Sequence, residues 1–157
     1  MSADPSAVVS AYWRFHELCQ GDREQRLAAE AGVGSWAWEA VEEAMQESDD
    51  QVLHLLDALL RAPEADPCYL GAGPIEELLY AHGPRWQEEI AQRCRTLAIW
   101  RNALTCVSLN DSERGKVPLL AGFLPRGNEA GAERTPAKRP KKVSRARGQR
   151  GGRQGHA

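Results

Sequence analysis

The chain has 157 residues, enough for one folded domain and an appended segment, and its formal net charge of −2 hides a strong asymmetry. Residues 1–128 hold 11 basic and 20 acidic side chains, a net charge of −9, whereas residues 129–157 hold 9 basic and 2 acidic ones, a net charge of +7. The N-terminal residues show no signal-peptide pattern and no apolar run is long enough to cross a bilayer, so the sequence argues against a membrane protein and predicts a cytoplasmic one.

The first residues repeat apolar side chains at helical spacing. In residues 5–20, Val8, Tyr12 and Trp13 fall on one side of a helix and predict an amphipathic element. A short helical turn is expected over residues 23–31, before the glycines that follow interrupt it.

Two further helices are predicted in the middle of the chain. Ser35 stands at the start of a helix over residues 36–47, where its hydroxyl is expected to accept from the free backbone amides. Residues 48–51, Ser-Asp-Asp-Gln, fit a capping box for a Leu-rich helix over residues 49–61.

Prolines and glycines divide the next stretch. Residues 66–82 predict a helical piece, a kink and a helix, and Gly83-Pro84 predicts the end of that helix and the start of another over residues 84–95. Leu97, Trp100, Leu104 and Val107 predict a last helix.

No segment alternates apolar and polar residues over the length of a strand, so the predicted fold class is all-α. Short connections favour antiparallel helical hairpins, either HEAT-like or in a small irregular helical bundle. The predicted divisions are a helical domain over residues 1–109, an irregular connection over 110–128 and a disordered, basic, Arg-, Lys- and Gly-rich tail over 129–157.

Cysteine spacing bears on the redox state. Cys19, Cys68, Cys94 and Cys106 are widely separated and form no CxxC pair. This pattern predicts reduced and mostly buried thiols rather than a disulfide framework.

Three groups of residues carry a resemblance to a known family. They are Trp36-Ala-Trp38-Glu39, the Leu-rich helix that ends at Arg61-Ala62-Pro63, and Ala72-Gly73-Pro74-Ile75-Glu76-Glu77-Leu78-Leu79 followed by His82-Gly83. Together they resemble a bacterial family classed as domain of unknown function number 6869, over about residues 35–109. The resemblance implies an α-helical bacterial protein and carries no ligand, activity or catalytic residues.

Side chains that carry chemistry do not form a recognisable catalytic pattern. His16 and Cys19 are too few for a zinc site, and His82 before Gly83 fits a helix C-terminus better than a general base. Glu76 and Glu77 are expected in the first turn of a helix, where they favour its dipole. Nucleotide-binding, serine-hydrolase and zincin motifs are absent from the sequence, so no catalytic, cofactor or metal residues are predicted.

Two candidate binding regions remain. Trp36 and Trp38 point about 200° apart on a helix, so one is expected at the surface, and they form a possible protein interface with Glu42 and Glu43. The tail is a possible polyanion-binding segment through Lys138, Arg139, Lys141, Lys142, Arg145, Arg147, Arg150 and Arg153. A solvated tail without a role, or an extension produced by a shifted reading frame, are the alternatives for these residues.

The sequence therefore predicts a non-catalytic, accessory or regulatory module whose partner is another protein, with no cofactor and no membrane contact. The alternative is a nucleic-acid-associated protein that uses its basic tail for non-specific affinity. An enzyme with a site between helical hairpins is the third and least favoured hypothesis.

Overall fold

Helices account for the regular structure of residues 4–126, the part of the chain that this computed structural model describes, and no strand occurs in it. In chain order the elements are α1 (Pro5–Gln20), α2 (Arg23–Glu30), α3 (Ser35–Glu47), α4 (Val52–Arg61), α5 (Pro67–Leu70), the π-helical turn η1 (Gly71–Ile75), α6 (Glu76–Thr96), α7 (Ala98–Leu104), α8 (Asp111–Gly115) and the 3₁₀ turn η2 (Pro118–Leu120). The predicted all-α class is confirmed. The predicted tail, residues 129–157, lies outside the described residues.

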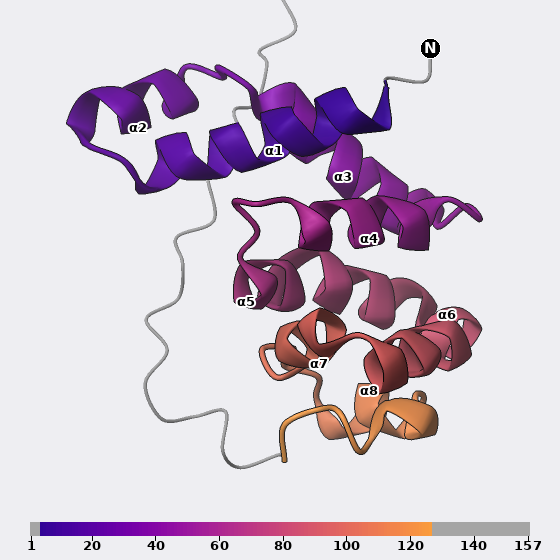
Figure 1. Ribbon diagram of the computed structural model, residues 1–157. Coiled ribbons are helices and arrows are strands. Elements are labelled where there is room, and N and C mark those ends of the chain that lie inside the picture. Colours follow the sequence, from indigo (N-terminus) through magenta and orange to yellow (C-terminus); the bar gives the residue numbers. More distant parts are fainter. Residues whose placement is uncertain (1–3, 127–157) are drawn as a thin grey trace, which may run out of the picture.

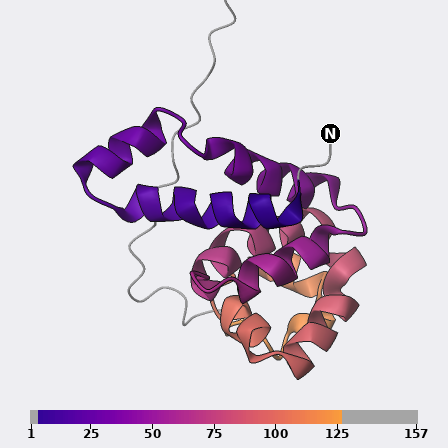
Figure 2. The same ribbon diagram turned by 45° about the horizontal axis from the view of Figure 1, so that its top comes forward.

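Successive helices follow one another along the molecule in chain order (Figure 1). The α1–α2 pair covers one end, α3 and α4 come next, and α5, α6, α7 and α8 complete the other end. Both views show α1 beside α3, while α2 projects away from the remaining helices (Figure 2). The architecture is thus a stack of short helices from which α2 projects.

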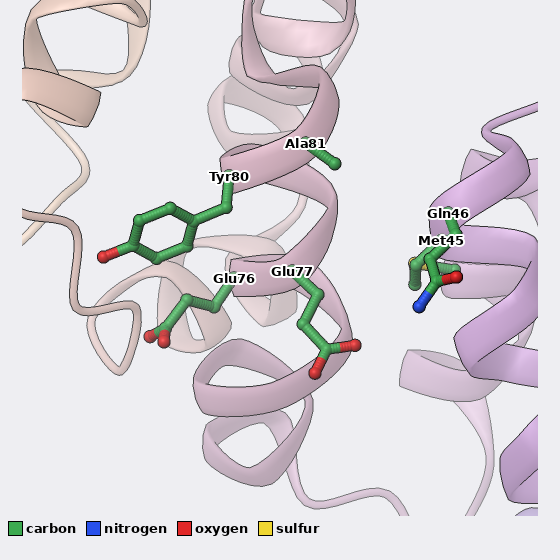
Figure 3. Close-up of a pocket in the computed structure, with 6 residues that line it drawn as sticks. All are labelled: Met45, Gln46, Glu76, Glu77, Tyr80 and Ala81. Carbon is green, nitrogen blue, oxygen red and sulfur yellow. The ribbon is translucent and has the colours of Figure 1, made fainter.

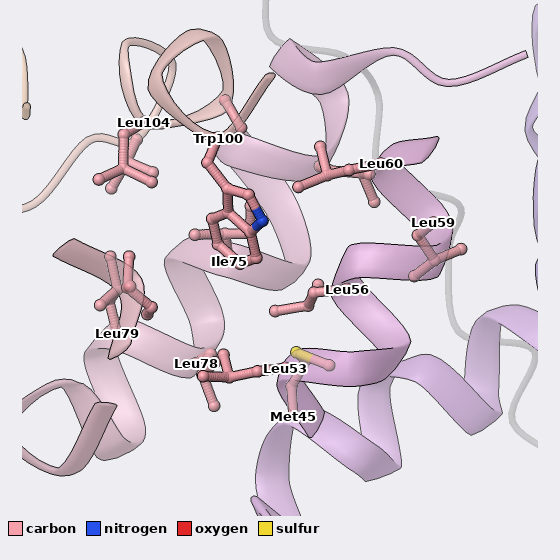
Figure 4. Packing of buried hydrophobic residues seen from close by; sticks show 14 of the residues in the cluster. Met45, Leu53, Leu56, Leu59, Leu60, Ile75, Leu78, Leu79, Trp100 and Leu104 are labelled. Atoms are coloured by element: carbon pink, nitrogen blue, oxygen red, sulfur yellow. The ribbon is translucent and has the colours of Figure 1, made fainter. Parts of the chain in front are cut away.

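One continuous apolar core runs through the stack. Figure 4 shows its centre, where side chains of α3, α4, η1, α6 and α7 meet. Buried members include Met45, Leu53, Leu56, Leu59, Leu60, Ile75, Leu78, Leu79, Trp100 and Leu104. The core also takes in Val117, Leu120 and Leu124, each at most 6% exposed. Residues 110–126 therefore belong to the helical domain and include α8 and η2, in contrast to the irregular connection expected there.

The predicted capping box at Ser48 is wrong. Ser48 lies at the end of α3 in the left-handed conformation, with φ of 51°, and α4 begins only at Val52. Its side chain is buried and its hydroxyl oxygen accepts a hydrogen bond from the indole Nε1 of Trp86 on α6. Ser48 thus joins two helices instead of starting one.

The predicted cap at Ser35 is also wrong. Gly34 is the N-cap residue of α3, and the Ser35 hydroxyl donates to the Gly32 carbonyl.

The predicted break near Gly83-Pro84 is present as a kink. The helix α6 continues across it, with non-helical φ of −139° and ψ of 17° at His82. His82 Nε2 donates to the Gln46 carbonyl at the end of α3 over 2.8 Å, because a carbonyl oxygen only accepts. His82 therefore lies at a kink inside α6 instead of at the expected helix C-terminus, and it satisfies a carbonyl of the neighbouring helix α3.

Two cysteines overturn the prediction of reduced thiols. Cys68 on α5 and Cys106 after α7 form a disulfide that closes a loop of 38 residues. Cys19 and Cys94 are free, Cys94 being buried as expected. Sequence spacing could not show the pairing, since only the approach of α5 to α7 brings the two sulfur atoms together. The predicted cytoplasmic location stays a prediction.

The approach of these elements also depends on Gly71. A Cβ added to Gly71 would collide with the carbonyl oxygen of Ala103 on α7. The backbone of η1 therefore lies directly against the backbone of α7, a distance that only glycine allows.

A buried carboxylate lies inside the core. Asp57 on α4 is 9% exposed, and its Oδ1 accepts from the Trp100 indole Nε1 over 2.7 Å. Its two oxygens also accept from Arg93 Nε over 3.1 and 3.2 Å. This one side chain thus connects α4 to α6 and α7.

Asp57→Ala should lower the free energy of unfolding by about 3 kcal/mol, because it leaves the Trp100 N–H and the Arg93 Nε–H without the carboxylate that accepts from both. Urea unfolding followed by circular dichroism measures the change. Asp50→Ala is the matched control, since the Asp50–Arg85 pair is largely exposed and its loss should cost less than about 1 kcal/mol. Equal losses in the two variants would contradict this account.

Gly71→Ala should lower the free energy of unfolding by about 1–3 kcal/mol, because the added methyl group pushes η1 away from α7. Gly73→Ala, two residues further in the same turn, meets no atom within 4 Å and should be neutral or slightly stabilising. Thermal melts of the two variants separate the packing effect from the general effect of replacing glycine.

Candidate functional site

The four predicted interface residues fall on two sides of α3. Trp36 is 47% exposed, and Glu43 is exposed on the same helical face. Trp38 and Glu42 lie about 200° and 240° away from Trp36 around the helix axis and are half-buried, with Trp38 packed against the core. The expectation that one of the two indoles reaches the surface is confirmed, and that indole is Trp36.

Exposed apolar side chains gather around Trp36 in the sequence. Of the five large exposed apolar residues in the described part of the chain, Leu27, Val33 and Trp36 fall between residues 27 and 36. They belong to the end of α2, the turn after it and the start of α3. The turn contains Gly32 and Gly34 at positive φ, and Gly34 lies against the side chain of Phe15, which fixes the direction of the chain into α3.

Carboxylates continue the exposed face beyond Trp36. Glu39, Glu43 and Glu47 follow at helical spacing, and all three are exposed. Residues 27–60 contain eight acidic side chains and no Lys or Arg. We call Leu27, Val33, Trp36, Glu39, Glu43 and Glu47 the Trp36 surface: it has apolar side chains at one end and an acidic row along α3.

A groove lies between the end of α3 and the first turns of α6, and we call it the α3–α6 groove. It has a volume of about 450 Å³ and is lined by Met45, Gln46, Glu76, Glu77, Tyr80 and Ala81. In Figure 3, Glu77 and Ala81 lie on the side of α6 that faces α3, whereas Tyr80 and Glu76 extend along the other flank.

Glu76 and Tyr80 hold the chain that follows α7. The Glu76 carboxylate accepts from the Ser108 backbone N–H over 2.7 Å, and the Tyr80 hydroxyl donates to the Ser108 carbonyl over 3.3 Å. The helix α6 continues directly from η1, so it offers no free N-terminal amides to Glu76. The expected dipole role of Glu76 is therefore replaced by a tertiary contact.

The end of α3 next to this groove is held by α6. Arg85 donates to the Ser48 carbonyl over 2.7 Å and pairs with Asp50 over 2.8 Å. Its guanidinium carbon also lies 4.5 Å from the centre of the Trp86 ring. Together with the bonds of His82 and Trp86, these contacts set the position of α3 against α6 and so the width of the groove.

His16 and Cys19 do not assemble a metal site. The His16 ring stacks 4.2 Å from the Tyr69 ring and 5.4 Å from the Trp13 ring, as measured between ring centroids. Within residues 4–126, no three His, Cys, Asp or Glu side chains come together as ligands. Burial raises the pKa of Tyr69 to about 12 and also raises the pKa of the Tyr12 hydroxyl beside it.

None of the helices within residues 4–126 is long and apolar enough to cross a membrane.

His16 should make the fold less stable in mild acid. Burial lowers the pKa of His16 below its ordinary value of 6.5, although Asp66 opposes the shift. The unfolded chain therefore binds the proton more readily, and the stability present above pH ~6.5 decreases as the pH falls below it. Urea midpoints between pH 7.5 and 5.5 should fall less in His16→Gln than in the wild type. His54→Gln, at an exposed position on α4, is the matched control, and an equal slope in all three proteins would contradict the assignment.

The comparisons with known proteins add no relative. Neither protein-family models, nor curated proteins, nor solved structures gave a significant match to the chain. The resemblance of residues 35–109 to the bacterial family stays a prediction.

Proposed function

We propose that this chain is a protein-binding module whose contact surface is the Trp36 surface. The observation that carries the proposal is the exposure of Trp36, Leu27 and Val33, at 47%, 53% and 55%, within ten consecutive residues of the chain. Burying large apolar side chains of this kind against a partner gives a favourable free energy, and Trp is enriched among residues that dominate binding.

The acidic row indicates which kind of partner this surface would bind. Glu39, Glu43 and Glu47 extend from Trp36 along α3, and no basic side chain occurs within residues 27–60 to offset them. A partner with an apolar contact and adjacent Lys or Arg side chains matches this surface, since complementary charge speeds encounter and selects the partner. The predicted Glu42 and Trp38 contribute less to such a contact because they are half-buried.

Association with nucleic acid through the tail is the second candidate. It is supported by nine Lys and Arg side chains among residues 129–157, which suit phosphate contacts. All eight predicted polyanion-binding residues, Lys138 to Arg153, lie outside the described residues. The proposal of a protein partner rests on the described surface and is therefore preferred.

Trp36→Ser should raise the dissociation constant for the partner at least about 30-fold, the effect of removing a binding hot spot. The partner is first isolated with the full-length chain from nuclease-treated extract, then purified and titrated by calorimetry. Glu39→Lys with Glu43→Lys should weaken binding as well. Leu119→Ser, at a residue 49% exposed on η2, is the matched control and should bind like the wild type.

Two results would overturn the proposal. The first is unchanged affinity of Trp36→Ser and the charge variants for every purified partner. The second is loss of vesicle binding in Trp36→Ser where the wild type binds neutral phosphatidylcholine vesicles, which would make the apolar end of the surface a membrane contact.

A further inference from the structure

The α3–α6 groove is a second surface, made of residues other than those of the Trp36 surface, and the proposed function does not use it. We propose that residues 138–153 of the same chain dock in this groove, so that the basic segment and the acidic helical domain bind each other.

The lining of the groove suits long basic side chains. Met45 and Ala81 offer apolar surface for the methylene groups of Lys and Arg, whose charged ends stay near solvent. The Glu77 carboxylate lies on the side of α6 that faces α3, as Figure 3 shows, and Tyr80 adds a ring that is 42% exposed. Carboxylates accept charge-assisted hydrogen bonds from guanidinium and ammonium groups, and aromatic faces attract the same cations.

Charge complementarity favours this segment as the occupant. Residues 1–128 have a net charge of −9 and residues 129–157 a net charge of +7. The helix α3 contributes Met45 and Gln46 to the groove and contains no basic residue that would repel the segment. The attraction acts within one molecule, where a short tether gives an effective concentration of about millimolar.

The chain leaves the domain close enough to reach the groove. The Leu119 N–H donates to the Gln87 side chain on α6 over 3.3 Å, and Val117 lies against Gly83 of the same helix. Glu77 lies ten residues before Gln87, about 15 Å along the helix axis. The eleven residues between Arg126 and Lys138 span up to about 40 Å when extended, so the tether is long enough.

Carbodiimide cross-linking of the full-length, nuclease-treated protein tests the proposal, because it joins an amine to a carboxylate only when they touch. The chain has four lysines, Lys116 and three in the segment, Lys138, Lys141 and Lys142. The Lys116–Glu113 pair, at 2.8 Å, is a built-in positive control. We expect the segment lysines to link mainly to Glu77, at a yield that is unchanged by tenfold dilution and several-fold lower in 0.5 M NaCl.

Variants provide a second readout that does not depend on cross-linking. Glu77→Lys should increase the rate of tryptic cleavage within residues 138–153 several-fold. Glu88→Lys, on the exposed part of α6 outside the groove, makes the same change in net charge and should leave the rate unchanged.

The proposal is overturned if the Lys116–Glu113 link forms while the segment lysines form none, or form links spread over carboxylates outside the groove. Links that disappear on dilution would show a contact between molecules and would overturn it as well. Protection from trypsin that is lost on nuclease treatment would identify nucleic acid as the ligand of the segment instead.

Discussion

A carboxylate taken out of water must find partners that replace its hydration, and in this protein Asp57 finds them on two other helices. Trp100 and Arg93 bring α7 and α6 to the same point of α4, beside the apolar core. Apolar contacts alone tolerate small shifts of one helix along another. The hydrogen bonds of Asp57 require defined distances and angles, so they prevent such shifts and fix the relative position of these helices.

The opposite end of the α3–α4 layer is positioned in a similar way. The chain turns at Ser48, whose left-handed backbone directs it from α3 to α4, and α6 supplies the hydrogen bonds to this turn through His82, Arg85 and Trp86. These contacts depend on the kink at His82, which sets the direction of the second half of α6. Both walls of the α3–α6 groove are therefore held by the same set of polar contacts.

The proposed binding surface is formed by side chains of α3 that the core does not bury. The helix α3 buries Ala37, Val41 and Met45 in the core. Trp36 and the acidic row of Glu39, Glu43 and Glu47 lie on the other face of α3 and are therefore exposed to solvent. A large apolar side chain that no helix covers, next to uncompensated carboxylates, is a surface suited to a basic and partly apolar partner. The net negative charge of residues 1–128 is also what we propose attracts the basic segment to the α3–α6 groove.

By itself, the sequence determined the helical class, most helix positions and the split between an acidic domain and a basic segment. Apolar spacing, prolines and glycines act locally, and a charge count needs no structure. It also indicated that Trp36 or Trp38 would be exposed, because residues two apart on a helix face nearly opposite sides. Only the tertiary structure decided which indole that was, since the answer depends on which face meets α1 and the core. The Cys68–Cys106 disulfide, the role of Ser48 and the partners of Asp57 and Glu76 were likewise decided there. Each joins residues 32 to 43 positions apart, and such pairings arise from how helices pack, which local sequence patterns do not encode.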